Sequence, residues 1–199
     1  MASTCSSLRA KGSSLIRFVE TELAGVILVE PQVHADGRGF FLESYHAGKY
    51  RDGGIPGPFV QDNHSRSTRG ILRGLHGQSP NAQGKLVRAI EGEIFDVAVD
   101  VRLGSPTFGQ FVTAVLSAEN FHQLYVPPGL IHGFAVTSET AQVEYKCTDL
   151  YRPEEDFSVR WDDPEIGIPW PLSDPVLSEK DRAAPLLRDV HDRLLPYHP

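Results

Sequence analysis

Cysteine, long apolar runs and excess positive charge are all scarce in this chain. Its two cysteines, Cys5 and Cys147, are too few for a disulfide framework or a zinc ligand set. No apolar stretch approaches the ~18 residues that a membrane span needs. The formal net charge of -7 argues against general affinity for nucleic acid, because nothing would neutralise phosphates broadly. These absences predict a soluble cytoplasmic protein with neither nucleic acid nor membrane as a partner.

The length and composition indicate one domain. The 199 residues are 40% hydrophobic, which suits a single packed core. Residues 1–14 are rich in serine and lack the apolar core of about 7–15 residues found in a secretory signal. Arg9 and Lys11, with no acidic residue nearby, give a weak hint of a transit peptide. We expect a disordered extension over 1–14 and a single domain over 15–199.

The pattern of the chain is that of a β protein. Fifteen prolines and eighteen glycines favour many short elements over long helices. Period-two alternation predicts strands at 26–30, 40–45, 86–90, 94–99, 111–116, 123–126, 133–137 and 143–147. Turn signals separate them at the spacing of a sandwich or barrel. Apolar residues at helical spacing over 186–195 predict a short C-terminal helix. The predicted architecture is an all-β, antiparallel double-sheet jelly-roll barrel with short C-terminal helices.

Two segments, 73–92 and 127–133, resemble the paired motifs of the cupin superfamily, which meet inside a small β-barrel and usually hold a metal. The usual first motif has two histidines and then a glutamate, but here it reads His76-Gly77-Gln78. The position expected to hold the glutamate offers only Ala82 or Gln83. Two histidines without a carboxylate make a poor transition-metal site. We therefore expect the barrel but no metal.

A closer resemblance covers nearly the whole chain, from about residue 26 to about residue 185. Eight segments in order resemble the dTDP-4-dehydrorhamnose 3,5-epimerase family: FVQDNHS (59–65), LRGLH (72–76), QGKLV (83–87), DVAVDVR (96–102), SPTFG (105–109), LSAEN (116–120), YKCT (145–148) and LSEKD (177–181). The resemblance implies a dTDP-linked 4-keto-6-deoxyhexose as substrate. It implies epimerisation at both carbons beside the ketone through an enolate, in dTDP-L-rhamnose biosynthesis, with no cofactor.

His76 and Asp181 are the first pair of catalytic candidates. His76 shares strand parity with Leu72 and Gly74, a pattern that fits either a hydrogen-bonded core histidine or a base titrating near neutrality. The resemblance implies the base. Asp181 matches the acid that orients this histidine in the family. Ser178, three residues earlier, makes a helix cap the alternative interpretation of that segment.

Lys85, His132 and Tyr145 complete the catalytic set that the resemblance implies. Lys85 would stabilise the enolate oxygen, and a solvated lysine at a strand edge is the alternative. His132 would donate to the same oxygen or to the sugar, and a structural histidine beneath Phe134 is the alternative. Tyr145 lies on the apolar face of its strand, so periodicity places it in the core. The resemblance makes Tyr145 the acid that reprotonates the sugar across the ring from His76.

The remaining candidates are substrate contacts. Arg73 is out of phase with His76, so it would leave the strand on the other face unless a bulge intervenes. The family places Arg73 near the diphosphate, where a guanidinium suits anionic oxygens. Further contacts implied by the resemblance are Arg38, Glu43, Gln61, Asp62, Asn63, Asp156 and Lys180. Because Arg38 and Glu43 match positions that often act across a dimer interface, we expect a homodimer.

Three alternatives and one departure accompany this interpretation. The residue after the catalytic histidine is usually aromatic in the family, but here it is Gly77, which could widen the pocket or loosen the strand. The nearest alternative is an epimerase that inverts only one carbon. The others are a metal-dependent cupin enzyme and a sugar-nucleotide-binding barrel without catalysis.

Overall fold

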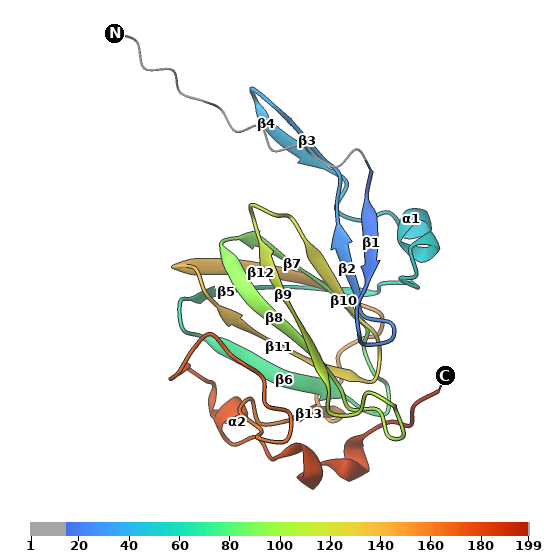
Figure 1. The fold of residues 1–199 in the computed structure, drawn as a ribbon, viewed down its shortest axis with the longest axis vertical. Helices are drawn as coiled ribbons and strands as arrows, with labels where there is room; N and C mark the ends of the chain where they lie inside the picture. Colours follow the sequence, from blue (N-terminus) through green and yellow to red (C-terminus); the bar gives the residue numbers. More distant parts are fainter. Residues whose placement is uncertain (1–14, 199) are drawn as a thin grey trace.

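Two antiparallel sheets face each other in the computed structural model, which describes residues 15–198 (Figure 1). The first sheet has the order β1 (Arg17–Glu20), β2 (Ile27–Glu30), β10 (Gln123–Val126), β7 (Lys85–Glu91), β12 (Thr140–Cys147), β5 (Gln61–Thr68). The second has the order β13 (Asp156–Ser158), β6 (Leu72–Gln78), β11 (Leu130–Val136), β8 (Glu93–Asp100), β9 (Phe111–Ser117). Every ladder within the two sheets is antiparallel, so the predicted double-sheet jelly roll is confirmed. The expected extension over 1–14 lies outside the described residues.

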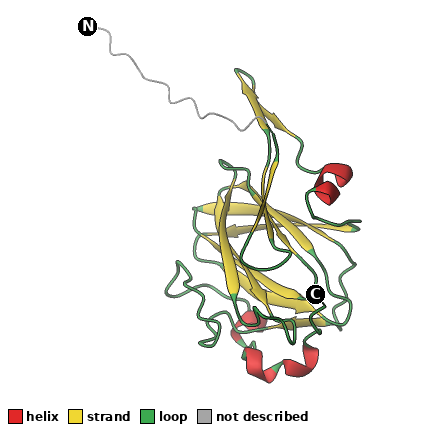
Figure 2. Ribbon diagram, turned by 45° about the vertical axis from the view of Figure 1, so that its right-hand side comes forward, coloured by secondary structure: helices red, strands yellow, loops and turns green. Residues whose placement is uncertain are grey.

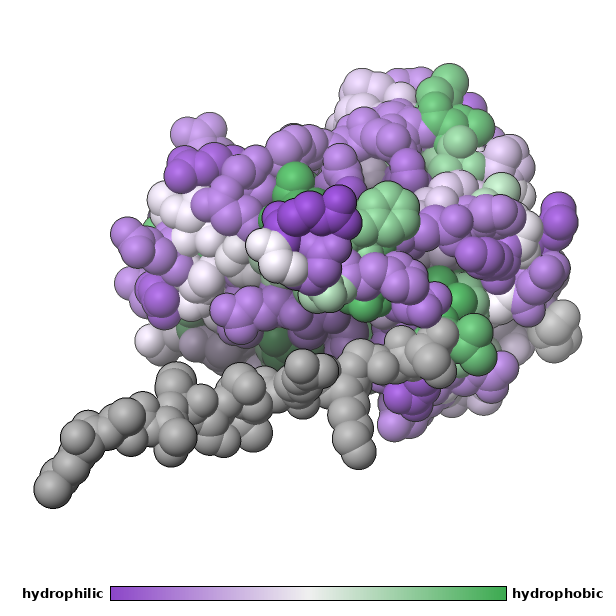
Figure 3. All heavy atoms as spheres, turned by 90° about the horizontal axis from the view of Figure 1, so that it is seen from above, coloured by the Kyte–Doolittle hydropathy of each residue, from purple (hydrophilic) through white to green (hydrophobic). Residues whose placement is uncertain are grey.

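A separate hairpin extends from one end of the barrel. It consists of β3 (Val33–Asp36) and β4 (Gly39–Leu42), and it stands clear of both sheets in Figure 1. The short helix α1 (Ala47–Asp52) follows and packs beside the first sheet. On the face seen from above in Figure 3, apolar side chains interrupt an otherwise hydrophilic surface. Phe40 and Phe41 of the hairpin are 60% and 70% exposed.

Helices are few and lie outside the barrel, as Figure 2 shows. Besides α1 they are α2 (Glu179–Arg182) and the 3-10 turns η1 (Leu187–Asp189) and η2 (His191–Arg193). The predicted helix over 186–195 is thus split into two 3-10 turns, because Val190 leaves the helical region with φ -116°. The apolar spacing still holds, since Leu187, Val190 and Leu194 are all buried. No helix within 15–198 is long and apolar enough to cross a membrane.

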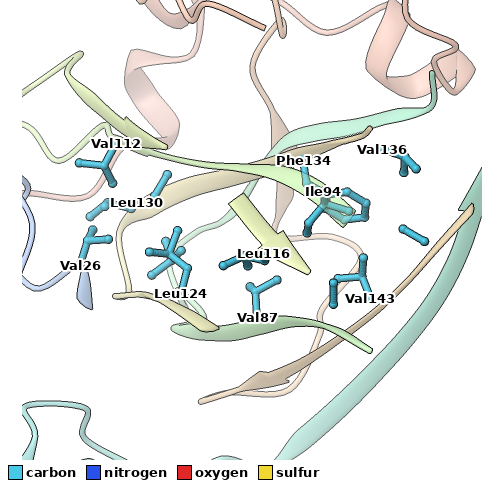
Figure 4. Packing of buried hydrophobic residues seen from close by; sticks show 14 of the residues in the cluster. Val26, Val87, Ile94, Val112, Leu116, Leu124, Leu130, Phe134, Val136 and Val143 are labelled. Carbon is cyan, nitrogen blue, oxygen red and sulfur yellow. The ribbon is translucent and has the colours of Figure 1, made fainter. Parts of the chain in front are cut away.

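The core fills the space between the sheets (Figure 4). Val87 and Val143 from the first sheet face Ile94 and Phe134 from the second. This packing follows from strand parity, because alternate side chains of each strand point to the same face. Burial of so many β-branched and aromatic side chains is the main stabilisation of the barrel.

The outer face of the second sheet is covered by the C-terminal segment. Leu75 of β6 and Val99 of β8 pack there against Ile166, Leu187 and Val190. This covering brings residues beyond 160 back to β6, which lies about ninety positions earlier in the sequence. The C-terminal segment therefore both closes the fold and reaches the strand that carries His76.

A buried carboxylate, Asp100, ties down the turn after β8. Its side chain accepts hydrogen bonds from Arg102, from the Ser105 hydroxyl at 2.6 Å and from the Thr107 hydroxyl at 2.7 Å. Burial alone would raise the pKa of Asp100, but these hydrogen bonds outweigh it and lower the pKa to about 2. A depressed carboxyl pKa contributes stability above the unfolded value, and this contribution is lost as pH falls through the folded value.

Replacing this carboxylate should therefore weaken the fold. We expect Asp100→Asn to lower the free energy of unfolding at pH 7 by about 2 kcal/mol, the linkage value of the shift. Wild type should lose the same contribution between pH of about 4 and about 2. Urea unfolding across pH measures both effects, with the exposed Asp174→Asn as the matched control. Equal stability of Asp100→Asn and wild type at pH 7 would contradict this account.

Candidate functional site

A cavity of about 590 Å³ occupies one end of the barrel interior. Its walls come from both sheets and from the segment around α2. His76, Lys85, His132, Tyr145 and Asp181 all line it, so the structure brings the five residues predicted for catalysis into one space.

His76 is held by Asp181 from α2. The His76 Nε2 atom lies 2.5 Å from Asp181 Oδ1. Burial alone would raise the pKa of Asp181, but hydrogen bonds from His76, Ser178 and the Gly74 backbone lower it, so the carboxyl is ionised. An ionised carboxylate only accepts, and Nε2 must therefore be the donor. The Nδ1 atom of His76 is left with a lone pair, which is the state that a general base requires.

The two alternatives for Asp181 turn out to be compatible. Ser178 is the N-cap of α2, and its hydroxyl accepts from the Asp181 backbone N–H at 3.1 Å. The cap uses the backbone of Asp181 and leaves its carboxylate free to bind His76. The short helix therefore fixes where the carboxylate points.

His132 forms a second pair of the same kind. Its Nε2 atom lies 2.8 Å from Oδ1 of Asp96, a fully buried residue of β8. The other oxygen, Asp96 Oδ2, is buried without a hydrogen-bond partner in the described chain. Asp96 was not among the residues predicted from the sequence, although it is the one acid in the interior of β8, between the acids that begin and end the strand.

The donor set does not fit the metal site typical of cupins. His76 and His132 each bond to a carboxylate through Nε2. Gln78, which replaces the second histidine of the motif, donates to the carbonyls of Asn81 and Leu150 and accepts from the Arg152 N–H. Its side chain is thus committed to holding loops. The described residues contain no cluster of three or more potential ligands among His, Cys, Asp and Glu.

Lys85 enters the cavity from the end of β7. Burial lowers the pKa of Lys85 below its usual value, and nearby Cys147, Asp156 and Asp96 oppose that shift. Among residues 15–198, no carboxylate oxygen lies within 4 Å of its ammonium. The side-chain nitrogen of Lys85 is therefore available to an oxygen placed in the cavity. Cys147 itself is a buried, unpaired thiol on β12, as expected for a strand residue.

Tyr145 faces the cavity from β12, in the sheet opposite His76. Burial raises the pKa of Tyr145, so the phenol keeps its proton at neutral pH. Val143 lies on the same face and belongs to the core. The core and cavity interpretations of Tyr145 are thus both correct, because the barrel interior serves as both.

Arg73 reaches the cavity through a bulge in β6. Against β11, His76 pairs with His132 but Arg73 pairs with Phe134, so β6 holds one extra residue between them. Gly74 lies in this bulge with φ +135°, and a Cβ there would lie 2.6 Å from the Gly133 Cα. The bulge returns Arg73 to the same face as His76, which resolves the parity conflict in the sequence.

Three adjacent candidates for substrate contacts on β5 point alternately to its two faces. Gln61 and Asn63 line the cavity, and they hydrogen-bond to each other at 3.0 Å. Asp62 points to the outer face, where it forms an ion pair with Lys146 at 3.0 Å. The expectation that Asp62 contacts the substrate is not supported within one chain, because alternate side chains of a strand face opposite sides.

The outer candidates fall into two groups. Asp156 and Lys180 line the cavity and form an ion pair with each other. Arg38 and Glu43 lie outside the cavity of their own chain: Arg38 pairs with Asp36, and Glu43 pairs with Lys49. Tyr151 also lines the cavity and was missed, because it stands in a loop that carries no periodic pattern.

Gly77 does not widen the cavity as its lack of a ring suggested. Its missing Cβ would point at the Phe157 ring, 2.6 Å away, and at Ile131. Both residues belong to the cluster on the outer face of the sheet. A side chain at this position would therefore face away from the cavity.

Comparison with known proteins identifies the family. The profile of dTDP-4-dehydrorhamnose 3,5-epimerase matches residues 20–189. The chain belongs to this epimerase family. It is 58% identical over 167 residues to the dTDP-4-dehydrorhamnose 3,5-epimerase of Pseudomonas aeruginosa, covering 83% of this chain and 92% of that one. It is 54% identical to the epimerase of Neisseria gonorrhoeae, covering 83% of this chain but only 51% of that longer relative.

A solved epimerase has the same fold. The dTDP-6-deoxy-D-glucose-3,5-epimerase from Legionella pneumophila, crystallised with dTDP-4-keto-L-rhamnose, superposes with a TM-score of 0.90. The two sequences are 49% identical, and the alignment covers 92% of this chain and all of that one. The epimerase fold expected from the sequence is therefore confirmed.

Proposed function

We propose that the protein is an isomerase that inverts C3 and C5 of dTDP-4-dehydro-6-deoxy-D-glucose, giving dTDP-4-dehydro-L-rhamnose for dTDP-L-rhamnose biosynthesis. One observation carries the proposal: His76 and Tyr145 come from opposite sheets and line one cavity. Membership of the epimerase family supports it. No cofactor is invoked, because the chemistry needs only proton transfer beside a ketone.

The first step is removal of a proton. His76 Nδ1 takes the hydrogen from a carbon beside the C4 ketone, and the electrons of the broken C–H bond form an enolate with its charge on the ketone oxygen. Asp181 stabilises the imidazolium that results. Lys85 stabilises the enolate oxygen. When its ring carries both protons, His132, held by Asp96 through Nε2, can donate from Nδ1 to the same atom.

The second step returns a proton to the other face of the sugar. Tyr145 gives its phenolic proton to the carbon, and the resulting phenolate and the imidazolium then recover their starting states by proton exchange with solvent. A base and an acid on opposite sheets address opposite faces of a ring between them, so the carbon is inverted. The same cycle at the second carbon completes the reaction.

The polar residues of the cavity wall suit the nucleotide part of the substrate. Arg73 donates to the Ser67 hydroxyl at 3.0 Å and has no carboxylate partner in the described chain, so its guanidinium is free for a diphosphate. Gln61 and Asn63 add amide groups to the cavity wall from β5. Asp156 and Lys180 would exchange their ion pair for contacts with the substrate.

A homodimer would give Arg38 and Glu43 a role. The β3–β4 hairpin carries Arg38 away from the barrel, and Glu43 follows directly (Figure 1). Exposed Phe40 and Phe41 give this hairpin apolar surface to bury. Both polar residues would then contact the nucleotide in the cavity of the partner. Residues 15–199 would act as one catalytic domain, and the cytoplasmic location stays a prediction.

Deuterium exchange tests the reaction. In heavy water, proton NMR of the keto-sugar nucleotide should show label at both C3 and C5 with wild type. We expect His76→Ala to slow exchange by about 10²–10⁴. His64→Ala, on the exposed face of β5, is the matched control and should exchange normally. Label at C3 alone would indicate single-carbon epimerisation, and tight ligand binding without any label in wild type would indicate a binding protein.

The acid role of Tyr145 has its own signature. Tyr145→Phe should impair product formation more than loss of the substrate hydrogen, because only reprotonation needs the phenol. The ratio of exchange to turnover measures the difference, with Tyr45→Phe outside the cavity as control. Unchanged turnover in Tyr145→Phe would remove Tyr145 from the mechanism.

Complementation tests the shared site. Mixing inactive His76→Ala with impaired Arg38→Ala under subunit exchange gives heterodimers with one intact site, so activity should recover to about a quarter of wild type. Sedimentation should give twice the chain mass of 22.0 kDa. No recovery on mixing, or a monomer in solution, would leave Arg38 and Glu43 without a role.

A further inference from the structure

The Phe157 ring lies against the backbone of Gly77, directly behind the proposed base. Phe157 is the middle residue of β13 and pairs with Gly77 in the ladder to β6. A Cβ on Gly77 would meet two ring atoms of Phe157 at 2.6 and 2.7 Å. The ring therefore occupies the space that a side chain at position 77 would take.

The ring is fixed from several sides. Phe157 is 9% exposed and belongs to the cluster that includes Leu75 and Ile131. The Arg193 guanidinium lies 5.7 Å from the ring centroid, and Arg193 also donates to the Glu155 carbonyl at 2.9 Å. Packing and a cation–π contact thus join β13 to the C-terminal segment.

The strand that Phe157 anchors borders the catalytic pair. β13 is only three residues long and lies at the edge of its sheet. Its Ser158 pairs with His76, and the next residue, Val159, exchanges backbone hydrogen bonds with Leu75 at 2.9 and 3.2 Å. A short edge strand has few backbone bonds to hold it, so its side-chain packing decides where it lies.

We propose that Phe157 is a positioning residue for catalysis. By filling the space over Gly77 it keeps β6 and β13 in register, and this register keeps the His76 ring on the Asp181 carboxylate. The proposal rests on the proposed role of His76 as the base. In this proposal the aromatic ring that is missing at position 77 is supplied by Phe157 of β13.

The first test separates positioning from stability. Phe157→Ala should lower kcat by about 10-fold to 100-fold, with a smaller change in KM, because a small displacement of a catalytic group is costly. Its acid limb in the pH–rate profile should move to lower pH, because a protonated His76 ring would lose the carboxylate that favours it. Ile166→Ala removes an apolar side chain from the same cluster but not from β13, so it should lower Tm and leave the profile unchanged. Phe157→Leu serves if the alanine variant does not fold.

Other titratable and charged groups of the cavity can also affect the pH–rate profile. Those around His76 are Arg73, Lys85, His132 with its partner Asp96, Tyr145, Asp156, Lys180 and Asp181. Asp181 is the one that bonds to the His76 ring. A shift of the acid limb that Asp181→Asn abolishes therefore reports this pair.

The second test is rescue. Gly77→Phe alone should be severely impaired, because its Cβ overlaps the Phe157 ring. Ile131 Cγ2 would also lie 2.9 Å from that Cβ, so the rescue variant carries Ile131→Val as well, with Ile131→Val alone as its control. In this variant, Gly77→Phe with Phe157→Ala and Ile131→Val, the new ring can enter the vacated space, so kcat and the pH profile should return toward wild type. Such a reversal would be non-additive, whereas two substitutions that each only loosen the packing should have effects that add.

The outcomes keep the two proposals apart. If wild type catalyses no exchange, the proposed function fails. If wild type is active but Phe157→Ala behaves like Ile166→Ala, or the rescue variant is worse than both Gly77→Phe and Phe157→Ala, the positioning role alone is overturned.

Discussion

The hydrogen bond between His76 and Asp181 is the constraint on which the site depends. It joins β6 to a helix of four residues that lies 105 positions later in the chain. A helix this short is not stable by itself. It is held by the N-cap of Ser178 and by its two flanks: Val176 accepts a backbone hydrogen bond from Leu72 of β6, and Leu187 packs on the outer face of the second sheet. The covering segment therefore contributes to chemistry as well as to stability.

The barrel interior is shared by the core and the cavity. Lys85 and Val87 lie on one face of β7, and Tyr145 and Val143 lie on one face of β12. A polar residue in place of an apolar one on such an inward-facing row therefore puts a catalytic group where a packing contact would otherwise be. The cost is that polar groups are buried, and a buried polar group needs a partner. Oδ1 of Asp96 has such a partner in His132, whereas Oδ2 of Asp96 has none in the described chain.

Strand periodicity predicted the apolar strands well, because one face of each is buried against the opposite sheet. It missed β5, whose eight residues are all polar, since this strand faces the cavity on one side and solvent on the other. The sequence offered two roles for Asp181 and could not show that both apply, because backbone and side chain act separately. It could not place Arg73, since the bulge at Gly74 depends on the close approach of Gly133 from another strand. The wider pocket suggested by Gly77 is not found for a similar reason, because the space beside Gly77 is filled by the ring of Phe157 from another strand.

The pairing of two histidines with two carboxylates also explains how a metal-binding type of barrel suits proton transfer. His76 and His132 are direct neighbours across β6 and β11, the arrangement that could begin a metal site. Each bonds to a carboxylate through Nε2 instead, and the side chain of Gln78 is hydrogen-bonded to the backbone of two loops. In the neutral ring of His76 this bond leaves a lone pair on Nδ1, and the carboxylate favours the charged ring once a proton arrives. The same positions on the same strands thus provide a base and a donor, and the stereochemistry then depends on Tyr145 reaching the substrate from the other sheet.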